Sequence, residues 1–228
     1  MFVCGVPRNL AEFSDAFNVG ETQFGELSVS LSMAKTIFAF RPEIYLAITA
    51  PNGAVAGYSS TYPLKERWAN ALVAGDIAEP DLTPDMLLCR EDGLDGTSIY
   101  IGSIVVSSNY DPFSKSVFLA NLLAWRALQL QDASVKRITA IMTPVTKQGQ
   151  RLVRYIGAER LGTKTDVNGH GIYGRKMSPG FLYRITSSVE KLLSNSMVKL
   201  DQDFQPSLLP HLVLPSPATT VSQSLDYV

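Results

Sequence analysis

Short runs of apolar and β-branched residues, separated by turn signals, predict the strands of this protein. Residues 44–49 (IYLAIT) and 54–62 (AVAGYSSTY) flank a Pro-Asn-Gly turn and predict a β-hairpin. Residues 98–106 (SIYIGSIVV) are almost continuously apolar, which is typical of a strand buried on both faces. The remaining predicted strands are residues 137–142, 160–165 and 171–177, the last two joined by the turn at Asn168-Gly169.

Apolar residues at helical spacing predict the helices. These helices cover residues 27–40, 64–73, 116–131, 146–156 and 184–200, and another helix is expected to begin within residues 82–88. Asn9 or Ser14 is expected to cap a short helix near the N-terminus. Gly75 and Gly157 are expected to end two of the helices, because glycine readily adopts the left-handed conformation found there.

The order of these elements predicts an α/β (α+β) fold with a mixed central sheet flanked by helices. Strand–helix–strand units require parallel, right-handed crossovers, whereas hairpins supply antiparallel pairs. We expect a single domain over residues 1–178, with its core in residues 44–177. Residues 179–228 are expected to form a C-terminal helix and an apolar tail, punctuated by prolines, that packs on the body or on a partner.

Composition narrows the functional classes. The chain has 228 residues, 46% of them hydrophobic, and 20 basic against 21 acidic residues. This balance argues against a nucleic-acid-binding protein, and no apolar run is long enough to span a membrane. Cys4 and Cys89 are expected to be free thiols in a reducing compartment, so we expect a cytoplasmic protein. The two histidines, His170 and His211, are too far apart in sequence to suggest a metal site.

The central elements are similar to the cofactor-binding centre of the GNAT (N-acetyltransferase) superfamily. The run YIGSIVV (residues 100–106) is followed by a turn and a long helix, as in that family. RITAIM (137–142) and KQGQRLVRYIGAE (147–159) fit its later strand and helix, and GAVAGYS (53–59) resembles its preceding hairpin strand. The resemblance covers residues 44–177 and depends on the order and spacing of elements.

This resemblance implies an N-acyltransferase that takes acetyl-CoA or a related acyl-CoA as the acyl donor and needs no metal. Its reaction would be direct attack by an amine whose identity the sequence does not give. In such proteins the acyl-pantetheine arm lies along the central strand, which implies contacts with Ile104, Val105 and Val106. Thr146 stands where an asparagine of the family often contacts the cofactor.

The family binds the cofactor's diphosphate where the next helix begins, because the first amides of a helix lack partners and its dipole attracts anions. The corresponding residues here are Ser114, Lys115 and Ser116. This turn departs from the family pattern, since Asp111 and Ser114 replace a basic residue or glutamine and a glycine. In one interpretation the serine hydroxyls and Lys115 still bind phosphate. In the other, Asp111 only caps the helix and Pro112 begins it, so that the site has lost its cofactor.

That second interpretation predicts a GNAT-like binding or regulatory module without acyltransferase activity. A homodimer sealed by the C-terminal tail is compatible with either interpretation. The family often uses a tyrosine of its last helix as a proton donor, but the matching residue here is Val153. Tyr155, Tyr110 and Tyr100 are therefore the candidate catalytic residues, and the central strand offers no obvious acidic base.

Overall fold

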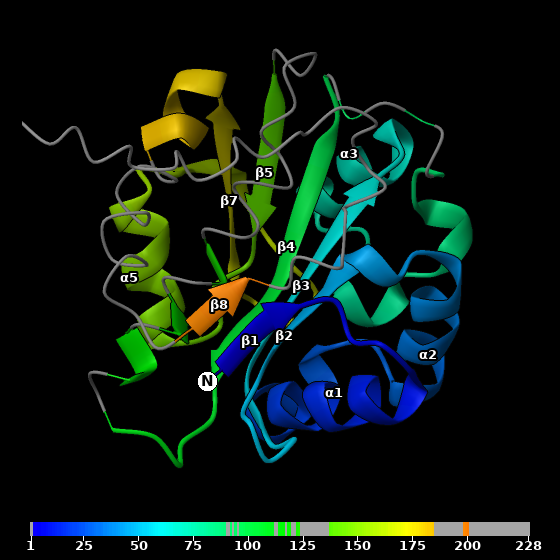
Figure 1. Cartoon of the computed structure of the whole chain (residues 1–228). Helices are drawn as coiled ribbons and strands as arrows, with labels where there is room; N and C mark the ends of the chain where they lie inside the picture. Colours follow the sequence, from blue (N-terminus) through cyan, green and yellow to red (C-terminus); the bar gives the residue numbers. More distant parts are fainter. Residues whose placement is uncertain are drawn as a thin grey trace, which may run out of the picture.

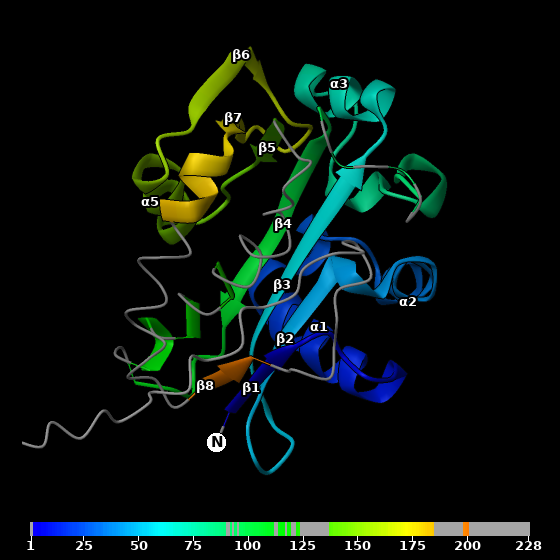
Figure 2. The same cartoon turned by 45° about the horizontal axis from the view of Figure 1, so that its top comes forward.

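Eight strands form one mixed sheet in the computed structural model, which describes residues 2–89, 92, 94, 96–111, 114–116, 118–119, 122–123, 137–184 and 198–200. The strand order is β6-β7-β5-β4-β3-β2-β1-β8 (Figures 1 and 2). Neighbouring strands are antiparallel, except for the parallel pairs β4–β5 and β1–β8. The predicted fold class, a mixed sheet flanked by helices, is confirmed.

The strands are β1 (Phe2–Gly5), β2 (Tyr45–Thr49), β3 (Val55–Leu64), β4 (Ser98–Val106), β5 (Ile138–Met142), β6 (Glu159–Thr165), β7 (Gly171–Met177) and β8 (Val198–Leu200). The α-helices are α1 (Leu10–Phe24), α2 (Leu31–Phe40), α3 (Glu66–Ala74) and α5 (Lys147–Tyr155). Short 3₁₀ turns are η1 (Gly25–Leu27), η2 (Pro42–Ile44), η3 (Glu79–Asp81) and η4 (Pro84–Met86). Residues 114–116, 118–119 and 122–123 are also helical.

Side chains and glycines at the helix ends explain where the helices begin and end. The Asn9 side chain accepts hydrogen bonds from the amides of Ala11 and Glu12 in α1, and the Ser30 side chain accepts one from the Met33 amide in α2. Helix α2 therefore begins at Leu31, four residues later than predicted. Gly75 ends α3 in the left-handed conformation, with φ of 74°, as its sequence position predicts.

Three expectations for the secondary structure were wrong or incomplete. Strand β1 was not predicted, because its four residues are too few to show an alternating pattern. The helix expected within residues 82–88 is the single turn η4, after which Leu87 pairs with Leu64 in an isolated β-bridge. The end of the helix predicted at residues 184–200 is strand β8, which pairs with β1.

The rest of the predicted C-terminal region, residues 185–197 and 201–228, lies outside the described residues. The division into a domain over 1–178 and a packed tail therefore stays a prediction.

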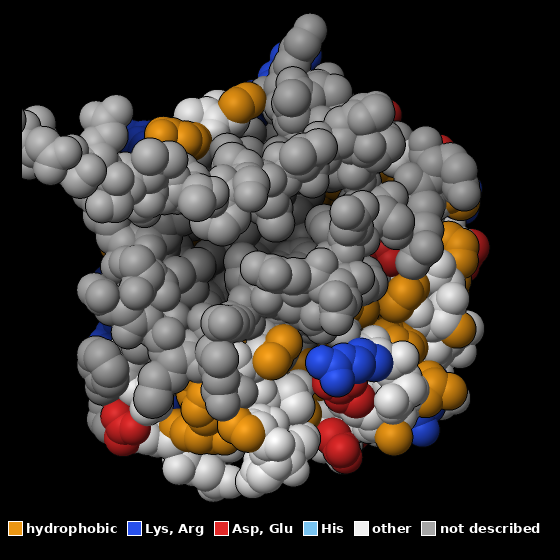
Figure 3. All heavy atoms as spheres, viewed as in Figure 1, with side chains coloured by type: hydrophobic (Ala, Val, Ile, Leu, Met, Phe, Trp, Pro, Cys, Tyr) orange, Lys and Arg blue, Asp and Glu red, His pale blue; other side chains and the backbone are white. Residues whose placement is uncertain are grey.

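Helices cover both faces of the sheet. A Cβ atom added to Gly20 of α1 would lie 3.1 Å from the Tyr58 ring, whereas one added to Gly57 would lie 3.3 Å from Leu122. Because Gly57 and Tyr58 are adjacent in β3, their substituents point to opposite faces. Helix α1 therefore covers one face of β3, and the helical segment that contains Leu122 covers the other. In Figure 3, acidic, basic and hydrophobic side chains are mixed over the N-terminal helices.

Aromatic side chains dominate the core on the α1 face. Phe13 stacks on Phe38 with ring centroids 4.5 Å apart, and Tyr45 meets Phe13 edge-on at 4.8 Å. Tyr58 and Tyr62 continue this aromatic layer along β3, and each lies about 6.1 Å from Tyr45. Such edge-on and offset pairs suit the charge distribution of aromatic rings. The layer extends from α1 to the centre of the sheet.

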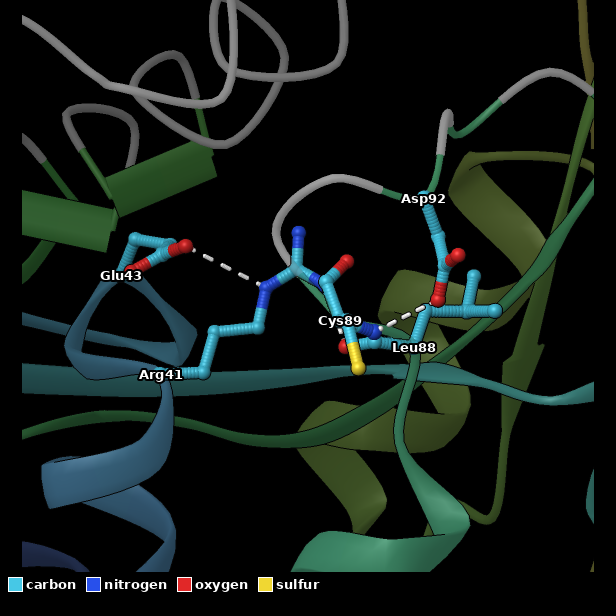
Figure 4. Close-up of polar contacts among 5 residues, drawn as sticks. All are labelled: Arg41, Glu43, Leu88, Cys89 and Asp92. Carbon is cyan, nitrogen blue, oxygen red and sulfur yellow. Dashed lines mark hydrogen bonds and ion pairs between the residues drawn. The ribbon is translucent and has the colours of Figure 1, made fainter.

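A buried arginine fixes the segment that leads into β4. Arg41, at the end of α2, is 1% exposed and donates hydrogen bonds from Nη1 to the carbonyl oxygens of Leu88, at 2.7 Å, and Cys89, at 3.0 Å (Figure 4). Its Nε lies 3.3 Å from Oε1 of the equally buried Glu43. Asp92 accepts a hydrogen bond from the Cys89 amide. Neither cysteine forms a disulfide bond; Cys4 is buried and Cys89 is exposed.

Candidate functional site

The sheet opens between β4 and β5. On the β5 side, β4 is paired only from Ser98 to Ile101, where Ile101 lies opposite Met142. On the β3 side the pairing continues to Val106. The second half of β4 therefore has one edge to which no described strand is hydrogen-bonded.

A β-bulge turns β4 at the start of this opening. Tyr62 pairs with Tyr100 and Tyr58 pairs with Val105, so β4 holds one residue more than β3 between these two pairs. The bulge lies around Gly102 and Ser103, and the Ser103 amide donates a hydrogen bond to Oγ of Ser60 at 2.9 Å. Bulges redirect side chains and interrupt pairing, and here the bulge coincides with the point where β4 leaves β5.

The direction of the β4 amides follows from two hydrogen bonds. The Ser103 and Ser107 amides both donate toward β3, the second of them to the Ala56 carbonyl at 2.9 Å. Because amides alternate in direction along a strand, those of Ile104 and Val106 point to the open edge. These two residues can offer both N–H and C=O groups to an extended ligand, as a strand would.

A cavity of about 400 Å³ fills the opening and reaches both faces of the sheet. One end is lined from the helical segment after β4 and from the start of α5, by Lys115, Ser116, Leu119, Thr146, Gln148 and Gly149. The other end is lined from α1, η1, α3, η3 and the β6–β7 turn, by Phe24, Leu27, Leu72, Ile77, Glu79 and Asp166. Ile104, Val105 and Val106 line the middle. A cavity of this size can hold part of a small-molecule ligand.

A buried carboxyl group lies at the second end of this cavity. Glu79 is 7% exposed, and its two oxygens accept long hydrogen bonds from Tyr62 Oη, at 3.4 Å, and Tyr100 Oη, at 3.3 Å. The two tyrosine rings stack with centroids 6.2 Å apart, and each hydroxyl group donates to a different oxygen of the carboxyl. Asp81 holds η3 by accepting a hydrogen bond from the Ala78 amide at 2.8 Å.

Burial sets the ionisation of this group. It raises the pKa of Glu79 to about 8, although the hydrogen bonds from Tyr100 and Tyr62 favour the carboxylate and oppose the rise. The pKa values of Tyr100 and Tyr62 are also raised, chiefly by burial. A carboxyl group with a pKa near neutrality can both accept and return a proton under ordinary conditions. This residue was missed at the sequence level, because nothing in the local sequence around Glu79 shows that it is buried.

The structure separates the three candidate tyrosines. Tyr100 lines the cavity and contacts Glu79. Tyr155 is 85% exposed on α5 and does not line the cavity. Tyr110 lies outside the cavity as well, in an aromatic cluster with Phe2 and Phe118.

The candidate diphosphate residues are also divided. Asp111 accepts hydrogen bonds from the Ser114 amide, at 3.1 Å, and from the Ser114 hydroxyl, at 2.5 Å. Asp111 is thus a helix cap, as the second interpretation of this turn expected, and it engages both donors of Ser114. Lys115 and Ser116 line the cavity. Thr146 lines it too and caps α5 by accepting a hydrogen bond from the Gly149 amide at 3.0 Å.

The arrangement of the sheet is found in solved structures. The chain is similar to the loading GNATL domain of CurA from Lyngbya majuscula, with 10% identity, 76% of this chain and 96% of that chain covered, and a TM-score of 0.52. This chain has a GNAT-type fold. At such low identity the likeness shows the fold alone, because proteins that share one fold can have different functions.

Two further structures are similar at lower scores. The NatC complex bound to Gag peptide and CoA is 13% identical over 78% of this chain and 98% of that chain, with a TM-score of 0.49. The CoA-dependent acyl-homoserine lactone synthase BjaI is 12% identical over 91% of this chain and 96% of that chain, with a TM-score of 0.48. No family model and no curated protein matches the sequence.

The described part of the chain contains no group of three or more His, Cys, Asp or Glu side chains that could hold a metal ion. None of its helices is both long and apolar enough to cross a membrane.

Proposed function

We propose that this GNAT-type protein is an acyl-CoA-dependent N-acyltransferase, with acetyl-CoA or a related acyl-CoA as donor and an amine as acceptor. The observation that carries the proposal is the position of the buried Glu79 carboxyl in the cavity where β4 separates from β5. An open strand edge can pair with an extended donor, and a group beside it that can take up a proton can serve as the base for attack by an amine.

The donor would lie along the open edge of β4. The backbone groups of Ile104 and Val106 would pair with the amides of the pantetheine arm, while Val105, on the other face of the strand, packs into the core. The diphosphate would lie toward Lys115 and Ser116, because Lys115 supplies a positive charge at this end of the cavity. Thr146 would contact the donor from the start of α5. Since Asp111 engages the donors of Ser114, Ser114 supports the turn in this proposal.

Glu79 and Tyr100 would move the protons. The amine nitrogen attacks the thioester carbonyl carbon, so that a C–N bond forms and the C–S bond breaks. Glu79, ionised, takes the proton that the amine loses. Tyr100 gives its proton to the leaving thiolate and regains one from Glu79 through their hydrogen bond. The net transfer is one proton from the amine to the thiol, and both protein groups return to their starting state.

A second candidate function is a binding or regulatory module without acyl transfer. The Asp111 cap supports it, because this turn carries a carboxylate close to where a diphosphate would lie. The cavity between β4 and β5 supports the enzyme instead, since a module that had lost its ligand has no need of an open edge there.

The test is an acetylation assay on the full chain. We expect purified protein to release free thiol from acetyl-CoA in the presence of an amine panel, with acetylated amine detected by mass spectrometry. Glu79→Gln should reduce this rate about 100-fold or more, because a positioned base contributes at least that much. Glu66→Gln, on the exposed side of α3, is the matched control and should leave the rate unchanged. If the protein neither bound acetyl-CoA nor acetylated any amine of the panel, the module would be favoured, because that interpretation expects a site without its cofactor.

Two further parts of the proposal concern the cellular location of the protein and its oligomeric state. We infer a cytoplasmic protein, supported by the free cysteines, one of them exposed. A homodimer sealed by the tail stays a prediction, and sedimentation of the chain with and without residues after Gln205 tests it. If the chain sedimented as a monomer both with and without these residues, the homodimer would be contradicted.

A further inference from the structure

The two ends of the cavity differ in charge. Among the described residues that line it, Lys115 is the single basic side chain, and it lies at the end formed by the helical segment after β4. Glu79 and Asp166 are the two acidic ones, and both lie at the opposite end. The proposed function assigns the basic end to the donor's diphosphate, so the acidic end is where the acceptor would enter.

Hydrogen bonds hold the Asp166 side chain in place at the acidic end of the cavity. It is 9% exposed, and its Oδ1 accepts hydrogen bonds from the amides of Asn168, at 2.9 Å, and His170, at 2.8 Å. Its Oδ2 lies 3.4 Å from Nδ1 of His170. Burial and the charge of Glu79 are the main causes that raise the pKa of Tyr100, and the charge of Asp166 adds the smallest contribution. The carboxylate is thus rigidly held and acts on the same space as Glu79.

Apolar side chains form the remaining walls of the acidic end. Phe24 and Leu27 reach it from the end of α1 and from η1, which packs against η3. Leu72 and Ile77 reach it from α3 and the segment that follows. Leu72 is 2% exposed, so this wall is part of the packed core. Burial of an apolar group of a ligand against this wall is favourable, whereas the wall offers no hydrogen bond to an anion.

We propose that the acceptor is a primary amine on an apolar, uncharged carbon framework, and that a carboxylate next to the amine is excluded. This inference rests on the proposed function, because that function makes an amine the acceptor. Asp166 attracts the ammonium form at the cavity end, and Glu79 takes its proton at the opening. A carboxylate on the same molecule would meet two acidic side chains and an apolar wall, and no described Lys or Arg side chain lines this end of the cavity to pair with it. Amino acids are therefore poor acceptors, whereas arylalkyl and alkyl amines are good ones.

Three related probes separate these features. Phenethylamine, phenylalanine amide and phenylalanine share the ring and the amine, but only the last carries a carboxylate. Their binding is measured by calorimetry on the full chain with CoA present, so that no transfer takes place. We expect phenethylamine and phenylalanine amide to bind at least about tenfold more tightly than phenylalanine. Equal binding of the three, preference for phenylalanine, or no binding of any would overturn the inference.

A charge variant tests the role of Asp166. Asp166→Asn should lower the affinity for phenethylamine and reduce the discrimination against phenylalanine by at least about threefold. Asp15→Asn is the matched control, since it removes the same charge from the exposed face of α1 outside the cavity. If Asp15→Asn reduced the discrimination as much as Asp166→Asn, the inference would be wrong. Because these measurements need no acyl transfer, their failure is distinguishable from a failure to bind acetyl-CoA.

Discussion

Glu79 lies directly against Gly102. A Cβ atom added to Gly102 would be 2.8 Å from Oε1 of Glu79 and 2.8 Å from the Tyr62 ring, closer than real Cβ contacts. The missing side chain at the bulge of β4 therefore makes room for the carboxyl group in the cavity. Glycine is needed here for a close approach, and its backbone conformation is not the reason, because Gly102 is not among the glycines with positive φ.

Replacing this glycine should impair catalysis through Glu79. We expect Gly102→Ala to displace the carboxyl group and to lower kcat by about 100-fold, the cost of a displacement of roughly 1 Å. Binding of acetyl-CoA, measured by calorimetry, should change less than threefold. Gly180→Ala, in the helical turn after β7, is a control for the general effect of such a change, since Gly180 has no positive φ and nothing lies within 4 Å of an added Cβ there. A Gly102→Ala enzyme with normal kcat would contradict the role of Glu79.

The raised pKa of Glu79 predicts a pH profile. The carboxyl must be ionised to accept a proton, and its pKa is about 8, so the rate should rise about tenfold per pH unit below that value and level off above it. The Glu79→Gln variant with the same amine gives the titration of the substrate itself, so the contribution of Glu79 is obtained from the ratio of the two rates at each pH. The residual activity of Glu79→Gln should lack the inflection. The same inflection in Glu79→Gln would assign it to another group.

The open edge of β4 predicts an unusual tolerance for proline. The Val106 amide points away from β3, so Val106→Pro removes no hydrogen bond between β3 and β4 but removes one offered to the donor. We expect acetyl-CoA to bind at least about tenfold more weakly, and the melting temperature to fall only slightly. Val105→Pro should instead destabilise the fold, because that amide points to β3. Normal binding by a folded Val106→Pro variant would contradict the placement of the donor along β4.

The Arg41–Glu43 pair predicts a large stability effect away from the cavity. Arg41→Met leaves Glu43 buried without its cation and removes the bonds to Leu88 and Cys89. We expect a loss of about 3–5 kcal/mol in unfolding free energy, measured by denaturant titration. Lys35→Met, on the exposed side of α2, should change it by less than about 0.5 kcal/mol. Similar values for the two variants would show that the buried pair contributes little.

Much of the fold could be predicted because its central strands are long and locally patterned. The runs at residues 44–49, 54–62 and 98–106 correspond to β2, β3 and β4. Strands β1 and β8 could not be predicted, since each is short and exists only through pairing with a distant segment. The prolines at positions 80 and 84 lie in the 3₁₀ turns η3 and η4. Thr83-Pro84 predicts the start of a helix, but only the single turn η4 forms there.

The candidate site was predictable where it depends on the backbone of one strand. The open backbone of Ile104 and Val106 lies on the strand that the resemblance to GNAT proteins singled out, and the Asp111 cap was one of two interpretations of the turn, suggested by the proline that follows Asp111. Glu79 was not, because its burial arises from Tyr62 on β3 and Tyr100 on β4, which lie 17 and 21 residues away. A buried acid in a loop carries no local sequence signal; only the tertiary structure places it beside the bulge.

Calorimetric titration of the full chain with acetyl-CoA tests the central claim most directly. The claim is that the opening between β4 and β5 binds an acyl-CoA. We predict saturable binding at one site per chain, with a dissociation constant in the micromolar range, and a rise in melting temperature through preferential binding to the folded state. No heat and no thermal shift at millimolar acetyl-CoA would contradict the claim.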